Sequence, residues 1–182
     1  DLKKEQKIKG LSHGQRVKAT LLLALARRPK LLVFDEPTTG LDPAVRKEVI
    51  DEMMNAIRDE SHSILFSSHN TLDVEQISDH ITFLYAGRIV DSSDKEAFMD
   101  GWRRIRLTNV DGKPLPDLPN IKDVRQHGRV CSVTVDRYQD AVAERLHESG
   151  MQVDAVERLT LEEIFLSNVL HAKANLAREP AR

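Results

Sequence analysis

The order of apolar and polar positions predicts alternating helices and strands in the first half of the chain. Residues 15–28 have apolar side chains on one helical face, and Pro29 ends that pattern. The continuous apolar run Leu31–Phe34 favours a strand buried on both faces, as in a parallel sheet. A second amphipathic helix from Pro43 to about Arg58 precedes another apolar strand, Ser63–Ser68. A strand, a helix and a strand joined by short links are typical of a right-handed βαβ crossover.

The second half of the chain has a different pattern. After a short helix at 72–78 and a hairpin over 81–90 that turns at Ala86-Gly87, the apolar runs become short and alternating. Four further strands are predicted at 103–110, 121–126, 129–136 and 151–159, and two helices at 138–148 and 161–170. Thr160 and Glu163 form a capping-box pattern for the last helix. This part is predicted to be a small α+β unit.

Composition and charge exclude several classes of function. The 182 residues are 40% apolar and 31% charged, and their net charge of −2 gives no reason to expect nucleic acid or anionic lipid as a partner. One cysteine, Cys131, excludes an intrachain disulfide and fits a reducing compartment. The longest purely apolar run, Leu21–Ala26, is far too short to cross a membrane. We therefore expect any membrane role to depend on a partner.

Two adjacent acids, Asp35 and Glu36, follow the first apolar strand directly. Ligand sites of parallel sheets lie just beyond the carboxyl ends of their strands, so both carboxylates could reach one crevice. Because neighbouring strand residues point in opposite directions, one acid could face a metal and the other an attacking water. The alternative is that the pair only begins a turn, which is the stronger interpretation when these two residues are considered alone.

Two further groups of residues could meet phosphate. Ser12 and Gly14 stand where a helix begins, and the unpaired N–H groups there favour an anion; the alternative is a plain serine N-cap. His69 follows the second apolar strand and should lie at the same sheet edge as Asp35, where an imidazole could donate to a phosphate oxygen. The spacing of His62, His69 and His80 matches no common zinc pattern.

Four short motifs occur together between Leu11 and Asn70. They are LSHGQ, LLVFDEP, TTGLDP and SSHN, and their order and spacing resemble those of the ATP-binding-cassette (ABC) ATPases. In that family they correspond to the signature motif, the Walker B strand, the D-loop and the switch-histidine loop. The resemblance implies an α/β fold class: a partial P-loop NTPase core with a mainly parallel sheet, plus a small α+β C-terminal domain.

The resemblance also implies roles for the residues around the two acids, with ATP and Mg²⁺ as cofactors. Asp35 resembles the Walker B aspartate that holds Mg²⁺, usually through water. Glu36 resembles the general base or water-polarising acid. His69 resembles the switch histidine that contacts the γ-phosphate. These three residues would act on the nucleotide that their own subunit binds.

A second set of residues would act on a nucleotide held by the opposite subunit. Ser12, Gly14 and Gln15 resemble signature residues that bind its γ-phosphate, and Asp42 resembles the D-loop aspartate that crosses the dimer interface. The chain departs from the family at His13, where the usual residue is glycine. Histidine fits poorly where φ is positive, but Gly14 is retained, and we expect the motif to work.

The phosphate-binding loop G-x-x-x-x-G-K-[ST] does not occur in these 182 residues. The only Gly-Lys pair, Gly112-Lys113, is followed by a proline in a late loop. In the family this loop lies upstream of the signature motif, and the chain begins, at Asp1 rather than Met, shortly before that motif. We expect a piece of a longer protein that, by itself, neither binds ATP tightly nor hydrolyses it.

The expected organisation has three parts: residues 1–100 as the C-terminal portion of an ABC ATPase core, 101–170 as a small α+β extension, and 171–182 as a polar tail. The extension, with LEEIF in its final helix, resembles that of ATPases from bacterial ABC exporters. The resemblance therefore implies a transport-coupled ATPase subunit on the cytoplasmic face of the membrane. Its partners would be a second ABC ATPase subunit, identical or different, and a transmembrane permease that provides its only membrane contact. The alternatives are a soluble ABC ATPase outside transport and a truncated, non-catalytic partner-binding chain.

Overall fold

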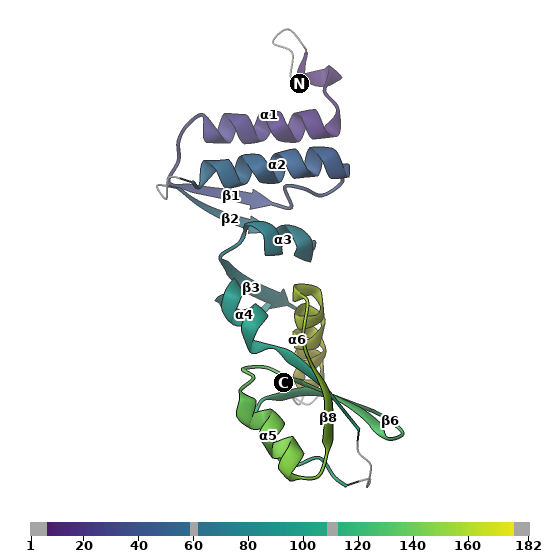
Figure 1. Cartoon of the computed structure of the whole chain (residues 1–182). Helices are drawn as coiled ribbons and strands as arrows, with labels where there is room; N and C mark the ends of the chain where they lie inside the picture. The colour runs from purple at the N-terminus through teal and green to yellow at the C-terminus, as the bar shows by residue number, and fades with distance from the viewer. Residues whose placement is uncertain (1–6, 59–61, 109–112, 177–182) are drawn as a thin grey trace. The chain divides into compact units, whose positions relative to one another are not determined.

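The computed structural model describes residues 7–58, 62–108 and 113–176 (Figure 1). The chain divides into two compact units, unit 1 (Asp1–Ile77) and unit 2 (Ser78–Arg182). This division precedes the one expected near residue 100, which stays a prediction about domains.

Unit 1 is built around one parallel strand pair. Its elements are the 3-10 turn η1 (Ile8–Gly10), α1 (His13–Leu25), β1 (Leu31–Asp35), α2 (Pro43–Ala56), β2 (Ser63–Ser67) and α3 (Thr71–Ile77). β1 and β2 pair in parallel from Leu31 opposite Ser63 to Asp35 opposite Ser67, and α2 is the connection between them. The predicted βαβ crossover and the α/β fold class are confirmed, although the parallel part of the sheet described here is this single pair.

One face of the β1–β2 pair packs against the helices. Leu21 of α1 and Val49 and Met53 of α2 are buried and contact Phe34 and Ile64 from the strands, and the two helices lie side by side (Figure 1). Residues that alternate with these point away from the helices.

The opposite face of the pair is exposed in unit 1. Leu31, Val33 and Leu65 are 56%, 65% and 62% exposed. The expectation that Leu31–Phe34 is buried on both faces is therefore wrong for the described residues. The physical reason is that α1 and α2 both pack against the same side of the strands.

Unit 2 begins with a hairpin and continues as a four-stranded sheet. Its elements are β3 (His80–Tyr85), β4 (Arg88–Asp94), α4 (Lys95–Gly101), β5 (Arg103–Thr108), β6 (Ile121–His127), β7 (Val130–Val135), α5 (Asp140–Glu148), β8 (Gln152–Arg158) and α6 (Leu161–Leu176). The hairpin turns at Ala86 and Gly87, whose φ values of 48° and 73° give the twist that a two-residue hairpin requires. The antiparallel sheet has the order β6-β7-β5-β8, and α5 buries Leu146 against its core residues Ile105 and Val133.

The last helix, α6, begins at the predicted capping box. The Thr160 N–H donates to Glu163 Oε2 at 3.0 Å, and the Glu163 N–H donates to Thr160 Oγ1 at 3.3 Å. The helix ends at Leu176, so residues 171–176 of the predicted polar tail are helical, and 177–182 lie outside the described residues. Phe165 of α6 and Phe98 of α4 each contact the ring of Phe83, with distances between ring centroids of 5.5 and 5.2 Å.

Candidate functional site

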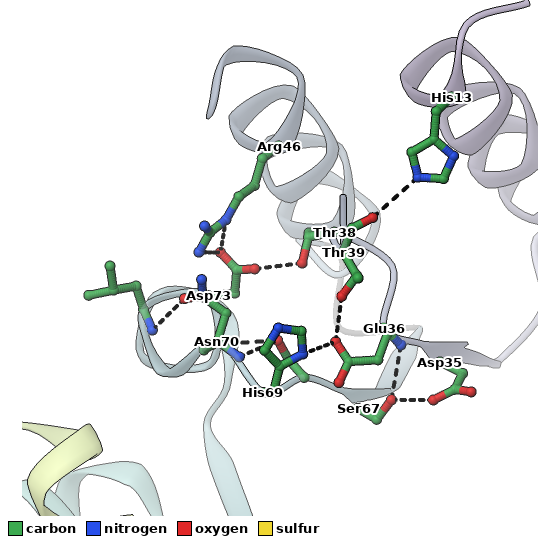
Figure 2. Close-up of polar contacts among 12 residues, drawn as sticks. His13, Asp35, Glu36, Thr38, Thr39, Arg46, Ser67, His69, Asn70 and Asp73 are labelled. Carbon is green, nitrogen blue, oxygen red and sulfur yellow. Dashed lines mark hydrogen bonds and ion pairs between the residues drawn. The ribbon is translucent and has the colours of Figure 1, made fainter. Parts of the chain in front are cut away.

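The candidate residues meet where the parallel strands β1 and β2 end. Asp35 is the last residue of β1 and lies opposite Ser67, the last residue of β2. The segments that follow β1 and β2 leave the sheet at the same edge, so Glu36 and His69 lie side by side (Figure 2). The prediction that the two acids and His69 share one sheet edge agrees with this geometry.

Ser67 joins the two acids. Its Oγ donates to Asp35 Oδ1 at 2.6 Å and accepts from the Glu36 N–H at 2.9 Å. One hydroxyl thus fixes the Asp35 carboxylate and also accepts a hydrogen bond from the backbone N–H of the next residue. Sequence reasoning missed Ser67, although its place opposite Asp35 in a parallel register could have indicated it.

Glu36 turns its carboxylate away from Asp35 and toward His69. Its φ of 47° is in the left-handed region, a conformation that costs a non-glycine residue about 1–3 kcal/mol. Glu36 Oε2 accepts from His69 Nδ1 at 2.9 Å and from Thr39 Oγ1 at 2.7 Å. Burial alone would raise the pKa of Glu36, but the bonds from His69 and Thr39 outweigh it and hold that pKa below its ordinary value. Glu36 is therefore an ionised acceptor at neutral pH.

Asp73 of α3 holds the turn that follows Glu36. This buried carboxylate accepts from Thr38 Oγ1 at 2.6 Å and from Arg46 Nε of α2 at 2.6 Å. It therefore ties the turn, α2 and α3 together behind the site (Figure 2). Sequence reasoning missed this contact, because nothing local marks an aspartate in a short helix as the partner of residues about thirty positions earlier.

The start of α1 is a complete capping box. Ser12 Oγ accepts from the Gln15 N–H at 3.2 Å, and the Ser12 N–H donates to Gln15 Oε1 at 3.0 Å. The N-cap role of Ser12 is therefore present, and its predicted role as an anion ligand stays a prediction. Gly14 has a packing reason of its own, because a Cβ there would stand 2.7 Å from Val45 Cγ1 of α2.

Asp42 lies at the end of the turn between β1 and α2, and the side chain of His13, from the start of α1, contacts that turn. Asp42 is the N-cap of α2, and its Oδ1 accepts from the Ala44 and Val45 N–H groups at 3.1 and 3.0 Å. His13 Nε2 lies 3.2 Å from the carbonyl oxygen of Thr39. In this chain both side chains contact their own subunit, and the predicted reach of Asp42 across a dimer interface stays a prediction.

The oxygen atoms at the ends of β1 and β2 suit Mg²⁺, which is one of the two predicted cofactors. Within the described ranges no three His, Cys, Asp or Glu side chains cluster as metal ligands. Mg²⁺ commonly takes one or two carboxylates and completes its shell with water and phosphate oxygens, so Asp35 fits such a site, with Ser67 as its neighbour. A closed, all-protein metal cage does not fit these residues.

Two properties of the surroundings matter for the site: the hydrogen bonding of buried polar atoms and the exposure of the His69 and Glu36 side chains to water. Among side chains that the structure describes, no buried nitrogen or oxygen lacks a hydrogen-bond partner. The His69 and Glu36 side chains are 73% and 35% exposed, so water screens their ion pair. No helix in the described part of the chain is long and apolar enough to cross a membrane.

Comparison with known proteins found similarity to a family model and to ATP-binding proteins of transporters. The family model described as "AAA domain, putative AbiEii toxin, Type IV TA system" matches residues 1–74. The ABC transporter ATP-binding protein YtrB of Bacillus subtilis is 26% identical over 168 residues, which cover 92% of this chain and 58% of YtrB. The energy-coupling factor transporter ATP-binding protein EcfA2 of Ligilactobacillus salivarius is 38% identical over 91 residues, covering 50% of this chain and 32% of EcfA2.

A solved structure of the ATP-binding subunit of an ABC transporter is 25% identical, with a TM-score of 0.45 over 50% of this chain and 38% of that chain. The chain thus spans less than two thirds of the length of these curated relatives.

Proposed function

We propose that this chain, which is similar to the ATP-binding proteins of ABC transporters, contributes the hydrolytic sheet edge of a transport-coupled ATPase. The observation that supports this most strongly is the paired arrangement at the ends of β1 and β2. Asp35 is held by Ser67, and Glu36 is held by His69 and Thr39. Two carboxylates with separate partners at one sheet edge suit two roles: one can bind a metal ion, and the other can position the attacking water.

In this proposal Asp35 would hold Mg²⁺, and Glu36 would orient the attacking water. Mg²⁺, when bound, would neutralise charge on the phosphates. The lowered pKa of Glu36 keeps its carboxylate ionised at neutral pH, so it can accept a hydrogen bond from water. Both roles that the family resemblance implies for Glu36, general base and water polarisation, belong to this proposal.

His69 would contact the γ-phosphate with the ring nitrogen that does not face Glu36. Its Nδ1 is used toward the Glu36 carboxylate, which leaves Nε2 for the phosphate. A neutral imidazole carries one N–H, so only the protonated ring donates at both nitrogens.

Ser12, Gly14, Gln15 and Asp42 would serve the nucleotide of a second ABC ATPase subunit. Their place at the starts of α1 and α2 presents helix N-termini, which favour anions. We propose a dimer of two such subunits, identical or different, with two ATP molecules between them.

The transport partner would be a transmembrane permease, bound at the cytoplasmic face, and we expect no nucleic-acid partner. The names of YtrB and EcfA2 describe ATP-binding proteins of transporters. The export direction rests on the resemblance of residues 101–170 to the C-terminal extension of exporter ATPases. The alternatives are a soluble ABC ATPase and a non-catalytic chain that binds a full-length partner.

The experiment that tests the proposal begins with the coding sequence upstream of Asp1, where we expect an in-frame G-x-x-x-x-G-K-[ST]. The protein that includes it should hydrolyse ATP, and Glu36→Gln should lower turnover by about 100-fold or more while ATP binding persists. Glu52→Gln, on the exposed side of α2, is the matched control.

Two results would contradict this proposal. Turnover that is unchanged in Glu36→Gln would remove Glu36 from the reaction. Vigorous, Glu36-dependent hydrolysis by the 182-residue chain alone would show that the phosphates are held by residues other than the family's phosphate-binding loop.

A further inference from the structure

His13, the residue at which the chain departs from the family pattern, contacts the turn between β1 and α2. Its ring extends from the first turn of α1, and Nε2 lies 3.2 Å from the Thr39 carbonyl oxygen. The same nitrogen is 3.6 Å from the position that a Cβ would take on Gly40, whose φ is +74°. The ring therefore packs against a turn that glycine keeps open.

Thr39 connects this contact to Glu36 and His69, because its backbone carbonyl faces His13 and its side-chain hydroxyl faces Glu36. Thr39, whose carbonyl accepts from His13, donates through Oγ1 to Glu36 Oε2 at 2.7 Å. The same Oε2 accepts from His69 Nδ1 at 2.9 Å. Figure 2 shows these residues in sequence from α1 to the end of β2. All of them belong to unit 1.

We propose that His13 is a positioning residue that couples the start of α1 to the Glu36–His69 pair through Thr39. Glycine, the usual family residue at this position, has no side chain to make the bond. In the proposed function the start of α1 and the Glu36–His69 pair serve different nucleotides, and His13 would then link the two sites within one subunit. That consequence rests on the proposed function, whereas the coupling itself does not.

The chemistry of the contact fixes which ring nitrogen carries hydrogen. A carbonyl oxygen only accepts, so Nε2 of His13 must donate. At His69 the carboxylate of Glu36 accepts from Nδ1, so the neutral ring there is predicted to carry its hydrogen on Nδ1, whereas the ring of His13 carries it on Nε2. The two histidines should therefore have opposite tautomers, which is a spectroscopic signature of these two contacts.

The turn between β1 and α2 also has hydrogen bonds that do not involve His13. The Thr39 N–H donates to the Glu36 carbonyl at 3.2 Å, and the Leu41 N–H donates to the Thr38 carbonyl at 3.3 Å. Asp73 holds the Thr38 side chain from behind. Loss of the imidazole should therefore loosen the position of Thr39 rather than unfold the turn.

The experiment measures ring tautomers in the 182-residue chain labelled with ¹⁵N at its seven histidines. Long-range ¹H–¹⁵N spectra are recorded about two units above the ordinary imidazole pKa, where the rings are neutral. The variants are His13→Ala, His13→Gln, Thr39→Val and the double variant His13→Ala/Thr39→Val. His127→Ala, on β6 in unit 2, is the matched control.

We expect wild-type His13 as the Nε2–H form and His69 mainly as the Nδ1–H form. His13→Ala should lower the Nδ1–H population of His69, relative to its Nε2–H population, by about twofold or more, the effect of weakening one hydrogen bond. His13→Gln should restore it, because its amide can donate to the same carbonyl, and His127→Ala should leave it unchanged. In the Thr39→Val background, His13→Ala should have no further effect.

Three results would overturn the coupling. They are wild-type His13 found as the Nδ1–H form, a His69 population unchanged in His13→Ala, and an undiminished effect of His13→Ala in the Thr39→Val background. The experiment uses neither nucleotide nor metal, so its failure would leave the proposed ATPase function standing, and a failed turnover assay would leave the coupling standing.

Discussion

Replacing Gly14 by alanine tests whether α1 and α2 meet as closely as the structure places them. The added Cβ would stand 2.7 Å from Val45 Cγ1, which is 0.7 Å short of the 3.4 Å at which ordinary contact begins. Valine in a helix has one strongly preferred rotamer, so its methyl group cannot swing aside freely. Overpacking of this kind costs about 1–3 kcal/mol, and the better helix propensity of alanine returns at most about 1 kcal/mol.

The expected net loss is therefore about 1–2 kcal/mol of unfolding free energy in unit 1, which corresponds to roughly 5- to 30-fold faster hydrogen exchange. Exchange of the α1 and α2 amides is the suitable assay, because residues 1–77 contain neither tryptophan nor tyrosine to report on this unit. Gly10→Ala is the matched control, since a Cβ at Gly10 would meet nothing within 4 Å.

The double variant Gly14→Ala/Val45→Ala makes the reasoning specific. Val45→Ala removes the methyl group in question, so it should recover stability in the Gly14→Ala background while costing stability in the wild type. If Gly14→Ala exchanged as slowly as the wild type, or if Val45→Ala lowered stability equally in both backgrounds, the close approach of the helices would be refuted.

Three further predictions concern single side chains. Ser67→Ala removes hydrogen bonds to both acids and should cost unit 1 about 1–2 kcal/mol, measured by hydrogen exchange of its amides, whereas Ser63→Ala, exposed on the same strand, should be neutral. Asp73→Ala leaves its guanidinium and hydroxyl donors without their acceptor and should cost about 3 kcal/mol or more by the same measurement; a loss under about 1 kcal/mol would contradict this. The bonds from Thr160 and Arg104 lower the pKa of Glu163 below its ordinary 4.5, so its contribution to stability is present above that pH and is lost as pH falls through the lowered value. The difference in melting temperature between wild type and Glu163→Gln should therefore be constant above about pH 5 and shrink on acidification; a difference that grew in acid would have the wrong sign.

The strand and helix pattern was predictable from sequence because periodicity is a local property. Leu31–Phe34 was correctly predicted as a strand, but the exposure of Leu31 and Val33 depends on which side of the sheet the helices cover. The helix start at Ser12 followed from capping chemistry. Local rules thus located the elements and left the burial of their faces to the tertiary arrangement.

The supporting residues of the site were beyond prediction for a related reason. Ser67 ends a strand in a sequence rich in serines, and only the register of β2 against β1 places its hydroxyl between the two acids. Nothing in the sequence around Asp73 distinguishes it from other helix residues, and only the folded structure buries it beside Arg46. The left-handed backbone of Glu36, which aims its carboxylate at His69, also has no signal in a Glu-Pro pair. Contacts made across the fold have no local sequence pattern.

The N-cap and the anion-site interpretations of Ser12 are compatible with each other. In the capping box, Ser12 Oγ accepts a hydrogen bond from the Gln15 N–H. A hydroxyl can accept and donate at the same time, so this bond does not use its hydrogen. A phosphate oxygen could take that hydrogen while the cap stays intact, and the helix dipole would favour the negative charge. Asp42 differs, because its carboxylate has no hydrogen to give to a phosphate. Its Oδ1 caps α2, and its Oδ2 could only accept a hydrogen bond, for example from a donor of a second subunit. Both caps fix the orientation of their side chains before any ligand or partner binds, which is the pre-organisation that a site between two subunits would need.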